Sequence, residues 1–160
     1  MLDIVLTEAL RELLSTVKNN KQDVCAYFTP VFLEDNSIFQ TVPNEINSRM
    51  SCPHPGAILQ TIKSIDIGGY DTSYKIASDY DHLSRYIQAF GIGKVLDLKC
   101  SVHAPGGLSY TRQLEGMIEC ELIKKRVWKY ADLRTHANLL KISTDFSINL
   151  ILQVEKLNSE

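Results

Sequence analysis

The sequence predicts a mixed α/β domain in which a few short strands are packed by helices. Apolar residues recur at helical spacing in the ranges 4–20, 78–90 and 109–128, which indicates amphipathic helices. Between these ranges lie short runs rich in β-branched and aromatic side chains, separated by glycine and proline. The 160 residues, of which 44% are hydrophobic, are enough for one domain with a core of its own.

Composition and charge indicate which partners and which cellular compartment to expect. The net charge of −2 lacks the basic excess of a nucleic-acid-binding protein, so we expect no nucleic-acid partner. Met1-Leu2-Asp3 has an acid where a secretory signal has basic residues, and no apolar run approaches the roughly 18 residues of a spanning helix. The four cysteines are scattered, and we expect them to be buried thiols. Together these features predict a cytoplasmic protein.

Residues 4–20 are predicted to form the first helix, with Thr7 as the N-cap and Asn19-Asn20 as the stop. Its expected buried stripe follows the spacing i, i+4, i+7, i+8 and i+11 on one face. The stripe consists of Leu6, Leu10, Leu13, Leu14 and Val17.

Residues 23–33 are rich in β-favouring side chains and predict a strand. Pro30 cannot donate a backbone hydrogen bond, so within this run it predicts an edge strand or a bulge. The turn residues 34–37 then allow residues 38–41 to return antiparallel. Residues 43–55 are polar, contain three prolines and predict a loop.

A short strand and a brief helix are predicted before the glycine pair, and a longer helix is predicted after it. Residues 56–60 predict a short strand, and residues 61–67 predict a brief helix that Gly68-Gly69 ends. Ser78 and Asp81 match a capping box at the start of the following helix. The expected buried face of that helix contains Tyr80, Leu83, Ile87 and Phe90.

After Gly91 closes this helix, residues 94–98 and 101–104 predict two short strands. A long helix, begun by Ser109 or Thr111, then runs to about Trp128.

The end of the long helix carries Lys124-Lys125-Arg126. We interpret these cations as a solvated helix end, where the helix dipole favours positive charge. Contact with a membrane surface, assisted by Trp128 and Tyr130, is the alternative. Residues 129–160 predict a helical extension, which places the domain boundary after residue 128 and gives the segments 1–128 and 129–160.

Two carboxylates, Asp79 and Asp81, open the helix that follows the glycine pair. Side chains two residues apart on a helix do not face each other, so they do not form a paired acid and base. One can extend over the glycine loop while the other stabilises the helix start, where the dipole favours an ionised carboxylate. An ionised carboxylate at the mouth of a loop can act as a general base towards a hydroxyl group.

Three motifs carry a resemblance to a known family. They are His54-Pro55-Gly56-Ala57, then residues 68–81 (Gly-Gly-Tyr-Asp-Thr-Ser-Tyr-Lys-Ile-Ala-Ser-Asp-Tyr-Asp), then Ala104-Pro105-Gly106-Gly107-Leu108-Ser109. They resemble the second, acceptor-side half of family 2, GT-A-type bacterial glycosyltransferases of capsule, colanic-acid and lipopolysaccharide biosynthesis. The resemblance covers about residues 4–128. It implies an incomplete GT-A-like fold with a helical C-terminal region.

The resemblance also assigns roles to particular residues. Asp79 takes the position of the family's catalytic base, whereas Ser78 replaces the acidic residue that commonly precedes it. The residues that the resemblance places on the acceptor side are His54, Gly68, Gly69, Asp71 and Asp81. The implied reaction is transfer of a sugar from a nucleotide-sugar to a hydroxyl group of a sugar or a lipid-linked sugar acceptor.

Family members need Mg²⁺ or Mn²⁺ and a nucleotide-binding half, which precedes the acceptor half. Here Asp3 and His103 are the only candidate metal ligands that the resemblance suggests. We therefore expect a truncated or split enzyme that is inactive without a separate nucleotide-binding half. A partial sheet would leave an open edge and an uncovered apolar face, which predicts self-association. Lipid-linked acceptors would place the protein at the inner face of the membrane.

Two other functions remain open. The first is a non-catalytic interaction module that keeps the fold as a binding surface. The second is a zinc-stabilised domain, for which Cys52-x-His54 and Cys100-x-x-His103 would supply the ligands. Neither spacing is typical of a zinc site.

Overall fold

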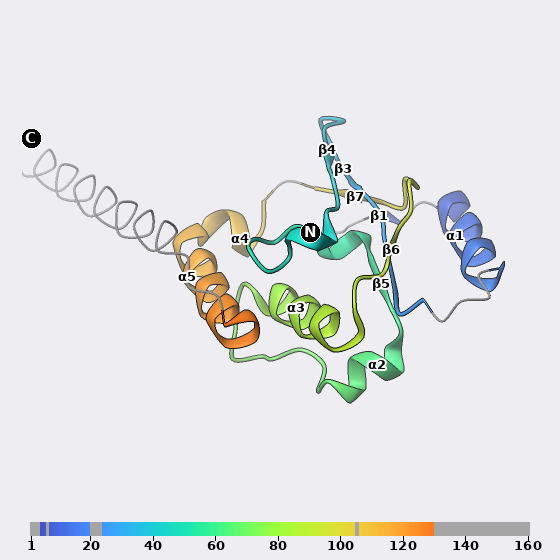
Figure 1. The fold of residues 1–160 in the computed structure, drawn as a ribbon. Coiled ribbons are helices and arrows are strands. Elements are labelled where there is room, and N and C mark those ends of the chain that lie inside the picture. Colours follow the sequence, from blue (N-terminus) through green and yellow to red (C-terminus); the bar gives the residue numbers. More distant parts are fainter. Residues whose placement is uncertain (1–3, 6, 20–23, 105, 130–160) are drawn as a thin grey trace, which may run out of the picture.

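The computed structural model describes residues 4–5, 7–19, 24–104 and 106–129, which form a mixed α/β structure with two small sheets (Figure 1). The four-stranded sheet has the order β1 (Ile4–Val5), β7 (Ser101–His103), β3 (Val31–Leu33) and β4 (Ile38–Phe39). The three-stranded sheet has the order β5 (Ala57–Leu59), β2 (Ala26–Phe28) and β6 (Lys94–Val95). The predicted fold class, mixed α/β with few short strands, is therefore confirmed.

Pro30 divides the run that was predicted to be one strand. β2 and β3 lie on either side of it and belong to different sheets, each with neighbours on both sides. The prediction of a single strand with an edge or a bulge at Pro30 was thus wrong. The backbone N–H of Thr29 donates to the carbonyl of Gly56 at 2.8 Å, and Thr41 Oγ1 donates to the carbonyl of Thr29 at 2.8 Å. These bonds hold the chain where it passes from one sheet to the other.

The helical elements lie on both sides of the strands, with α3, α4 and α5 on one side and α1 on the other (Figure 1). They are α1 (Thr7–Asn19), α2 (Thr61–Asp66), α3 (Ser78–Phe90), α4 (Leu108–Thr111) and α5 (Gln113–Ile123), with 3₁₀ turns η1 (Pro43–Glu45) and η2 (His54–Gly56) and a π-helical turn, η3 (Lys124–Trp128). The predicted long helix is therefore interrupted. Arg112, with φ of −122° and ψ of 46°, leaves helical geometry between α4 and α5.

Helix α3 lies at the centre of the hydrophobic core. Tyr80, Leu83 and Tyr86 are at most 1% exposed, and Ile87 is also buried. α3 packs against α5, η3 and the strand β2 through a cluster that also contains Cys25, Ala26, Phe28, Ile46, Cys52, Ala77, Ile123 and Val127. The predicted buried face of this helix is confirmed for Tyr80, Leu83 and Ile87, while Phe90 packs at its margin.

Helix α1 forms over almost the predicted range but buries little of its apolar stripe. Only Leu13 is buried, whereas Leu10, Leu14 and Val17 are each more than a third exposed. The helix lies at the far end of the molecule from α3 and α5, so little core is available to cover it (Figure 1). The first residues of the predicted helix, Ile4–Val5, instead pair antiparallel with β7.

The start of α3 is stabilised from another element and not by the predicted capping box. Ala77 is the cap residue of α3, and no side chain among the described residues caps it. The carboxylate of Glu119 in α5 accepts backbone N–H bonds from Lys75, Ile76 and Ala77, each at 2.8 Å. Burial raises the pKa of Glu119, but these N–H groups outweigh it and lower the pKa overall.

The glycine pair ends α2 as predicted. Gly68 and Gly69 have φ of 86° and 63°, values at which glycine is strongly preferred. The N–H of Gly69 donates to the carbonyl of Ser64 and that of Gly68 to the carbonyl of Ile65, each at 2.8 Å, which is a Schellman motif. The expected extension 129–160 lies outside the described residues from 130 onward.

Candidate functional site

A cavity of about 660 Å³ opens between η2, the start of α3 and helices α4 and α5. Apolar side chains such as Met50, Ile76 and Met117 line it, and polar groups converge on it from several elements. The polar groups include Arg49, His54, Asp79, His103, Gln113 and Lys124. A mostly apolar hollow with a few convergent polar groups is the usual form of a small-molecule site.

Asp79 lies in the wall of this cavity, at the first turn of α3. Its side chain is half-buried, and its Oδ1 accepts the backbone N–H of Tyr80 at 2.7 Å. Burial raises the pKa of Asp79, although the N–H of Tyr80 and the nearby His54 oppose that shift. A carboxylate with a raised pKa is a stronger base when ionised, which suits proton abstraction from a bound hydroxyl.

His54, in η2, lies on the same side of the cavity as Asp79 but is itself exposed. One ring nitrogen, Nε2, is 3.1 Å from the hydroxyl of Tyr70. His54 also lines a second, smaller cavity, so it forms part of a wall that the two hollows share. Asp79 and His54, to which the resemblance assigns the base and an acceptor contact, thus line the same cavity.

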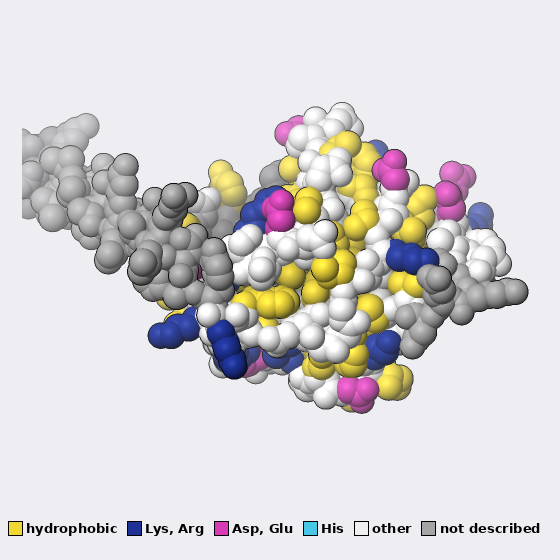
Figure 2. All heavy atoms as spheres, in the orientation of Figure 1, with side chains coloured by type: hydrophobic (Ala, Val, Ile, Leu, Met, Phe, Trp, Pro, Cys, Tyr) yellow, Lys and Arg dark blue, Asp and Glu magenta, His cyan; other side chains and the backbone are white. Residues whose placement is uncertain are grey.

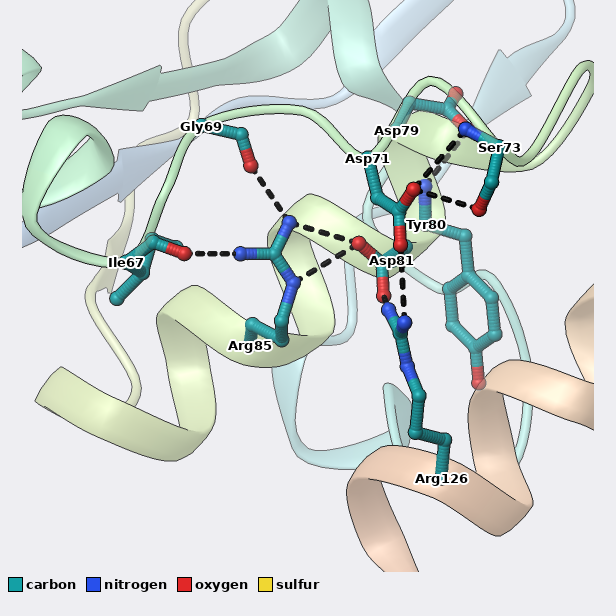
Figure 3. Close-up of polar contacts among 9 residues, drawn as sticks. All are labelled: Ile67, Gly69, Asp71, Ser73, Asp79, Tyr80, Asp81, Arg85 and Arg126. Carbon is teal, nitrogen blue, oxygen red and sulfur yellow. Dashed lines mark hydrogen bonds and ion pairs between the residues drawn. The ribbon is translucent and has the colours of Figure 1, made fainter.

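Asp81 lies elsewhere, although it is only two residues from Asp79. It is fully buried and is not among the residues that line the described cavities. Arg85 Nη2 lies 2.7 Å from Oδ2 of Asp81, and Arg126 bonds to Oδ1 (Figure 3). Because both carboxylate oxygens already have arginine partners, we no longer expect Asp81 to bind an acceptor.

Asp71 joins the same network from the loop after the glycine pair (Figure 3). Its Oδ1 accepts the backbone N–H and the hydroxyl of Ser73, at 3.0 and 2.6 Å, and Arg126 Nη1 lies 2.9 Å from Oδ2. These bonds, that from the Ser73 hydroxyl first, lower the pKa of Asp71 to about 2. The carboxylate therefore shapes the loop and binds Arg126, which is a different role from the predicted acceptor contact.

Arg85 connects this network to the glycine pair. Its guanidinium donates to the carbonyl of Ile67 and, at 2.6 Å, to the carbonyl of Gly69 (Figure 3). Gly69 borders the smaller cavity, whereas Gly68 is exposed. The positive φ of both glycines is by itself a reason for glycine at these positions.

Of the two metal ligands that the resemblance suggested, the structure describes His103. His103, at the end of β7, lines the large cavity, but no group of three or more His, Cys, Asp or Glu among the described residues could hold a metal ion. Cys52, His54, Cys100 and His103 are all described, so the proposed zinc cluster does not form there. Asp3 lies outside the described residues.

Sequence reasoning missed the contribution of the cationic segment after α5. Lys124 is buried and lies 2.5 Å from the buried carboxylate of Glu121, and both line the large cavity. Arg126 is the partner of Asp71 and Asp81. The interpretation of this segment as a solvated helix end was therefore wrong for the buried Lys124, whereas Lys125 and Arg126 are exposed, the latter also being ion-paired.

Comparison with protein-family models found no match for this chain, and comparison with curated proteins found none either. These comparisons therefore show no family for the chain, and the glycosyltransferase expectation rests on the resemblance of the three motifs alone. Within the part of the chain that the structure describes, no helix is both long enough and apolar enough to cross a membrane.

Proposed function

We propose that this chain provides the acceptor-binding side, with the general base, of a glycosyltransferase of surface-polysaccharide synthesis. The observation that carries the proposal is the position of Asp79. The one carboxylate that the resemblance assigns to catalysis lies in the wall of the 660 Å³ cavity, in surroundings that raise its pKa.

The proposed reaction is a substitution at the anomeric carbon of a nucleotide-sugar. Asp79 removes the proton from an acceptor hydroxyl as the oxygen forms its bond to the anomeric carbon. The bond from that carbon to the diphosphate breaks, and the nucleoside diphosphate leaves with the electron pair. We assign no step to Mg²⁺ or Mn²⁺, since the described residues offer no cluster of ligands for either ion. Donor binding is assigned, on the resemblance alone, to a separate nucleotide-binding half.

The chemistry of the cavity suits a sugar acceptor. Sugars have apolar C–H faces and hydroxyl groups at their edges, and the cavity offers both kinds of contact. Met50, Ile76 and Met117 supply apolar surface, while Gln113 can donate to and accept from hydroxyls and the ion-paired Lys124 can donate to them.

A non-catalytic interaction module is the second candidate, and it is favoured by a different observation. Large apolar side chains are exposed on α1, α2 and α4, among them Leu14, Ile62 and Tyr110. Exposed apolar surface of this kind often marks a protein-binding face. Under this alternative the large cavity would bind no sugar.

Binding of simple sugars separates the two candidates. A panel of methyl glycosides of glucose, galactose, mannose, rhamnose and N-acetylglucosamine would be titrated into protein with ¹³C-labelled methionine methyl groups. We expect at least one glycoside to shift the signals of Met50 and Met117, because both residues line the cavity. If no member of the panel moves either signal, the acceptor proposal is wrong.

A matched pair of variants tests the role of Asp79. Asp79→Asn should leave the fold intact but remove the base, whereas Asp97→Asn alters an exposed carboxylate outside the cavity. Transfer from UDP-, GDP- or dTDP-sugars with Mn²⁺, measured with the nucleotide-binding half supplied, should fall about 10²–10⁴-fold in Asp79→Asn only. Equal rates in the two variants would contradict the assignment of the base.

A further inference from the structure

A second cavity of about 260 Å³ lies between β5, α2 and the glycine loop, with His82 of α3 in its wall. Tyr70 of the glycine loop and Ser64 of α2 also line it, as does His54, which lines the large cavity as well. Since one water occupies about 30 Å³ of liquid, the space corresponds to roughly nine waters.

His82 is the unusual group in this cavity. It is 2% exposed, yet neither ring nitrogen has a hydrogen-bond partner among the described residues. Its ring lies 4.3 Å from that of Tyr70, centroid to centroid, and 6.3 Å from that of Tyr86 in an edge-on arrangement. Buried polar groups are nearly always hydrogen-bonded, so two unpartnered nitrogens in a residue of the cavity wall leave hydrogen-bonding capacity for a water or a ligand.

The character of the walls restricts that partner. Burial, assisted by the charge of Arg85, lowers the pKa of His82, which therefore has one N–H donor and one acceptor nitrogen at neutral pH. One hydroxyl group can accept from the first nitrogen and another can donate to the second, because the two nitrogens point in different directions. Of the residues that line the cavity, none is Asp, Glu, Lys or Arg, whereas Thr61 and Ser64 add hydroxyls. A neutral molecule with several hydroxyl groups matches these walls, and an anion does not.

We propose that this cavity is a second sugar subsite, which holds the unit of the acceptor next to the one that reacts at Asp79. The assignment of the ligand as a sugar rests on the function proposed above, whereas the site itself rests on His82. His54 lines both cavities, so an acceptor of two units can cross beside it from one to the other. The exposed ring of Tyr70, 48% accessible, provides an aromatic surface at the mouth.

Histidine ring signals test the proposal directly. Protein with ¹⁵N-labelled histidine would be titrated with the methyl glycosides named above, with methyl glycosides of disaccharides built from the same sugars, and with inorganic phosphate. We expect disaccharide glycosides to shift the His82 ring nitrogens and the Met50 and Met117 methyl signals together. His82→Phe keeps the ring and should weaken disaccharide binding about tenfold, the loss expected for hydrogen bonds of this kind.

Controls separate the two proposals. Methyl shifts at Met50 and Met117 with unchanged His82 nitrogens would overturn the subsite and leave the proposed function standing. His82 shifts without methyl shifts would support the subsite and overturn the function proposed for the large cavity. Shifts of His82 with phosphate but with no sugar would contradict a neutral ligand. Disaccharide affinity that is unchanged in His82→Phe would indicate that the cavity holds only water and would also overturn the subsite.

A second variant covers the case in which His82→Phe does not fold. Ser64→Phe places a bulky ring in the same cavity from half-buried α2, away from the core around α3. It should block the disaccharide shifts at His82. Persistence of those shifts in Ser64→Phe would contradict binding in this cavity.

Discussion

Gly93 lies so close to strand β2 that a Cβ atom on it would be 2.1 Å from the carbonyl oxygen of Ala26. The same Cβ would be 2.7 Å from the Cβ of Ala26, so no rotation of a side chain could relieve the clash. Glycine at this position allows the chain after α3 to turn back beside β2, where β6 pairs with it in parallel.

Gly93→Ala should therefore destabilise the protein by at least about 1–3 kcal/mol, the usual cost of overpacking, because the backbone itself has to move. Gly116→Ala is the matched control. In α5 the new Cβ would be 3.1 Å from Cγ2 of Ile76, a side-chain contact that a shift of a few tenths of an ångström relieves, and helix propensity offsets that tight contact by about 0.5–1 kcal/mol. Urea unfolding at constant m-value measures both changes. Similar midpoints for the two variants would contradict the steric argument.

At the scale of elements, Arg126 connects the π-helical turn η3 to α3 and to the glycine loop. It bonds to the buried Asp81 in α3 and to Asp71 in the loop, while Arg85 bonds to Asp81 and to the loop carbonyls. Two arginines and two aspartates thus hold three segments together beside the candidate site. Their geometry keeps the glycine loop against α3.

Arg126→Met keeps an apolar stem but leaves Asp81 with Arg85 as its one described cationic partner. Losing one arginine from a fully buried carboxylate should cost about 1–3 kcal/mol, reduced because the Arg126 side chain is itself 45% exposed. Arg49→Met is the control, since Arg49 pairs with Glu45 on the surface, where such pairs contribute about 0–1 kcal/mol. Chemical denaturation of both variants measures their free energies of unfolding, and the loss should be larger for Arg126→Met than for Arg49→Met.

The pH dependence of the stability difference between wild type and Arg126→Met provides a second check. The folded-state pKa of Asp71 is lowered from 3.8 to about 2. Ionised Asp71 therefore stabilises the folded protein, and this contribution is fully present above pH 3.8. That stability is lost as the pH falls through about 2. The difference between wild type and Arg126→Met should therefore shrink in this acid range. A difference that stays constant from pH 4 to pH 2 would show that Asp71 contributes nothing to it.

At the scale of the whole molecule, much apolar surface stays uncovered. Hydrophobic side chains run in a band across the middle of the face shown in Figure 2. On α1, the exposed residues Leu10, Leu14 and Val17 follow the spacing of a helix that packs against another element. Within the described residues only Leu13 of α1 is buried. An uncovered face of this kind favours association with another chain.

We predict that the protein self-associates as its concentration rises. Replacing Leu10 and Leu14 by Gln and Val17 by Thr should shift sedimentation velocity profiles towards the monomer, because it removes the apolar stripe of α1. Gln at Ile62 and Ile65, which are exposed on α2, is the control for a general gain in solubility. A wild-type protein that stays monomeric at high concentration would contradict the prediction.

Local sequence determined much of this protein by itself. Periodicity located α1 and α3 within a few residues, and glycine with positive φ ended α2 and α3 where predicted. The motif around residue 79 drew attention to Asp79, which does lie at a cavity. These features depend on neighbours along the chain, whose conformational preferences a sequence displays directly.

Only the tertiary structure decided which faces are buried and which charges pair. Pro30 divides one β-favouring run between two sheets, α1 leaves its stripe exposed, and Arg126 reaches across 45 positions to Asp81. The same long-range packing buries His82 against Tyr70 without a partner for its nitrogens. Burial and ion pairing depend on contacts between segments that are distant in the sequence. Such contacts form only when the whole chain packs, so the local periodicity of the sequence does not predict them.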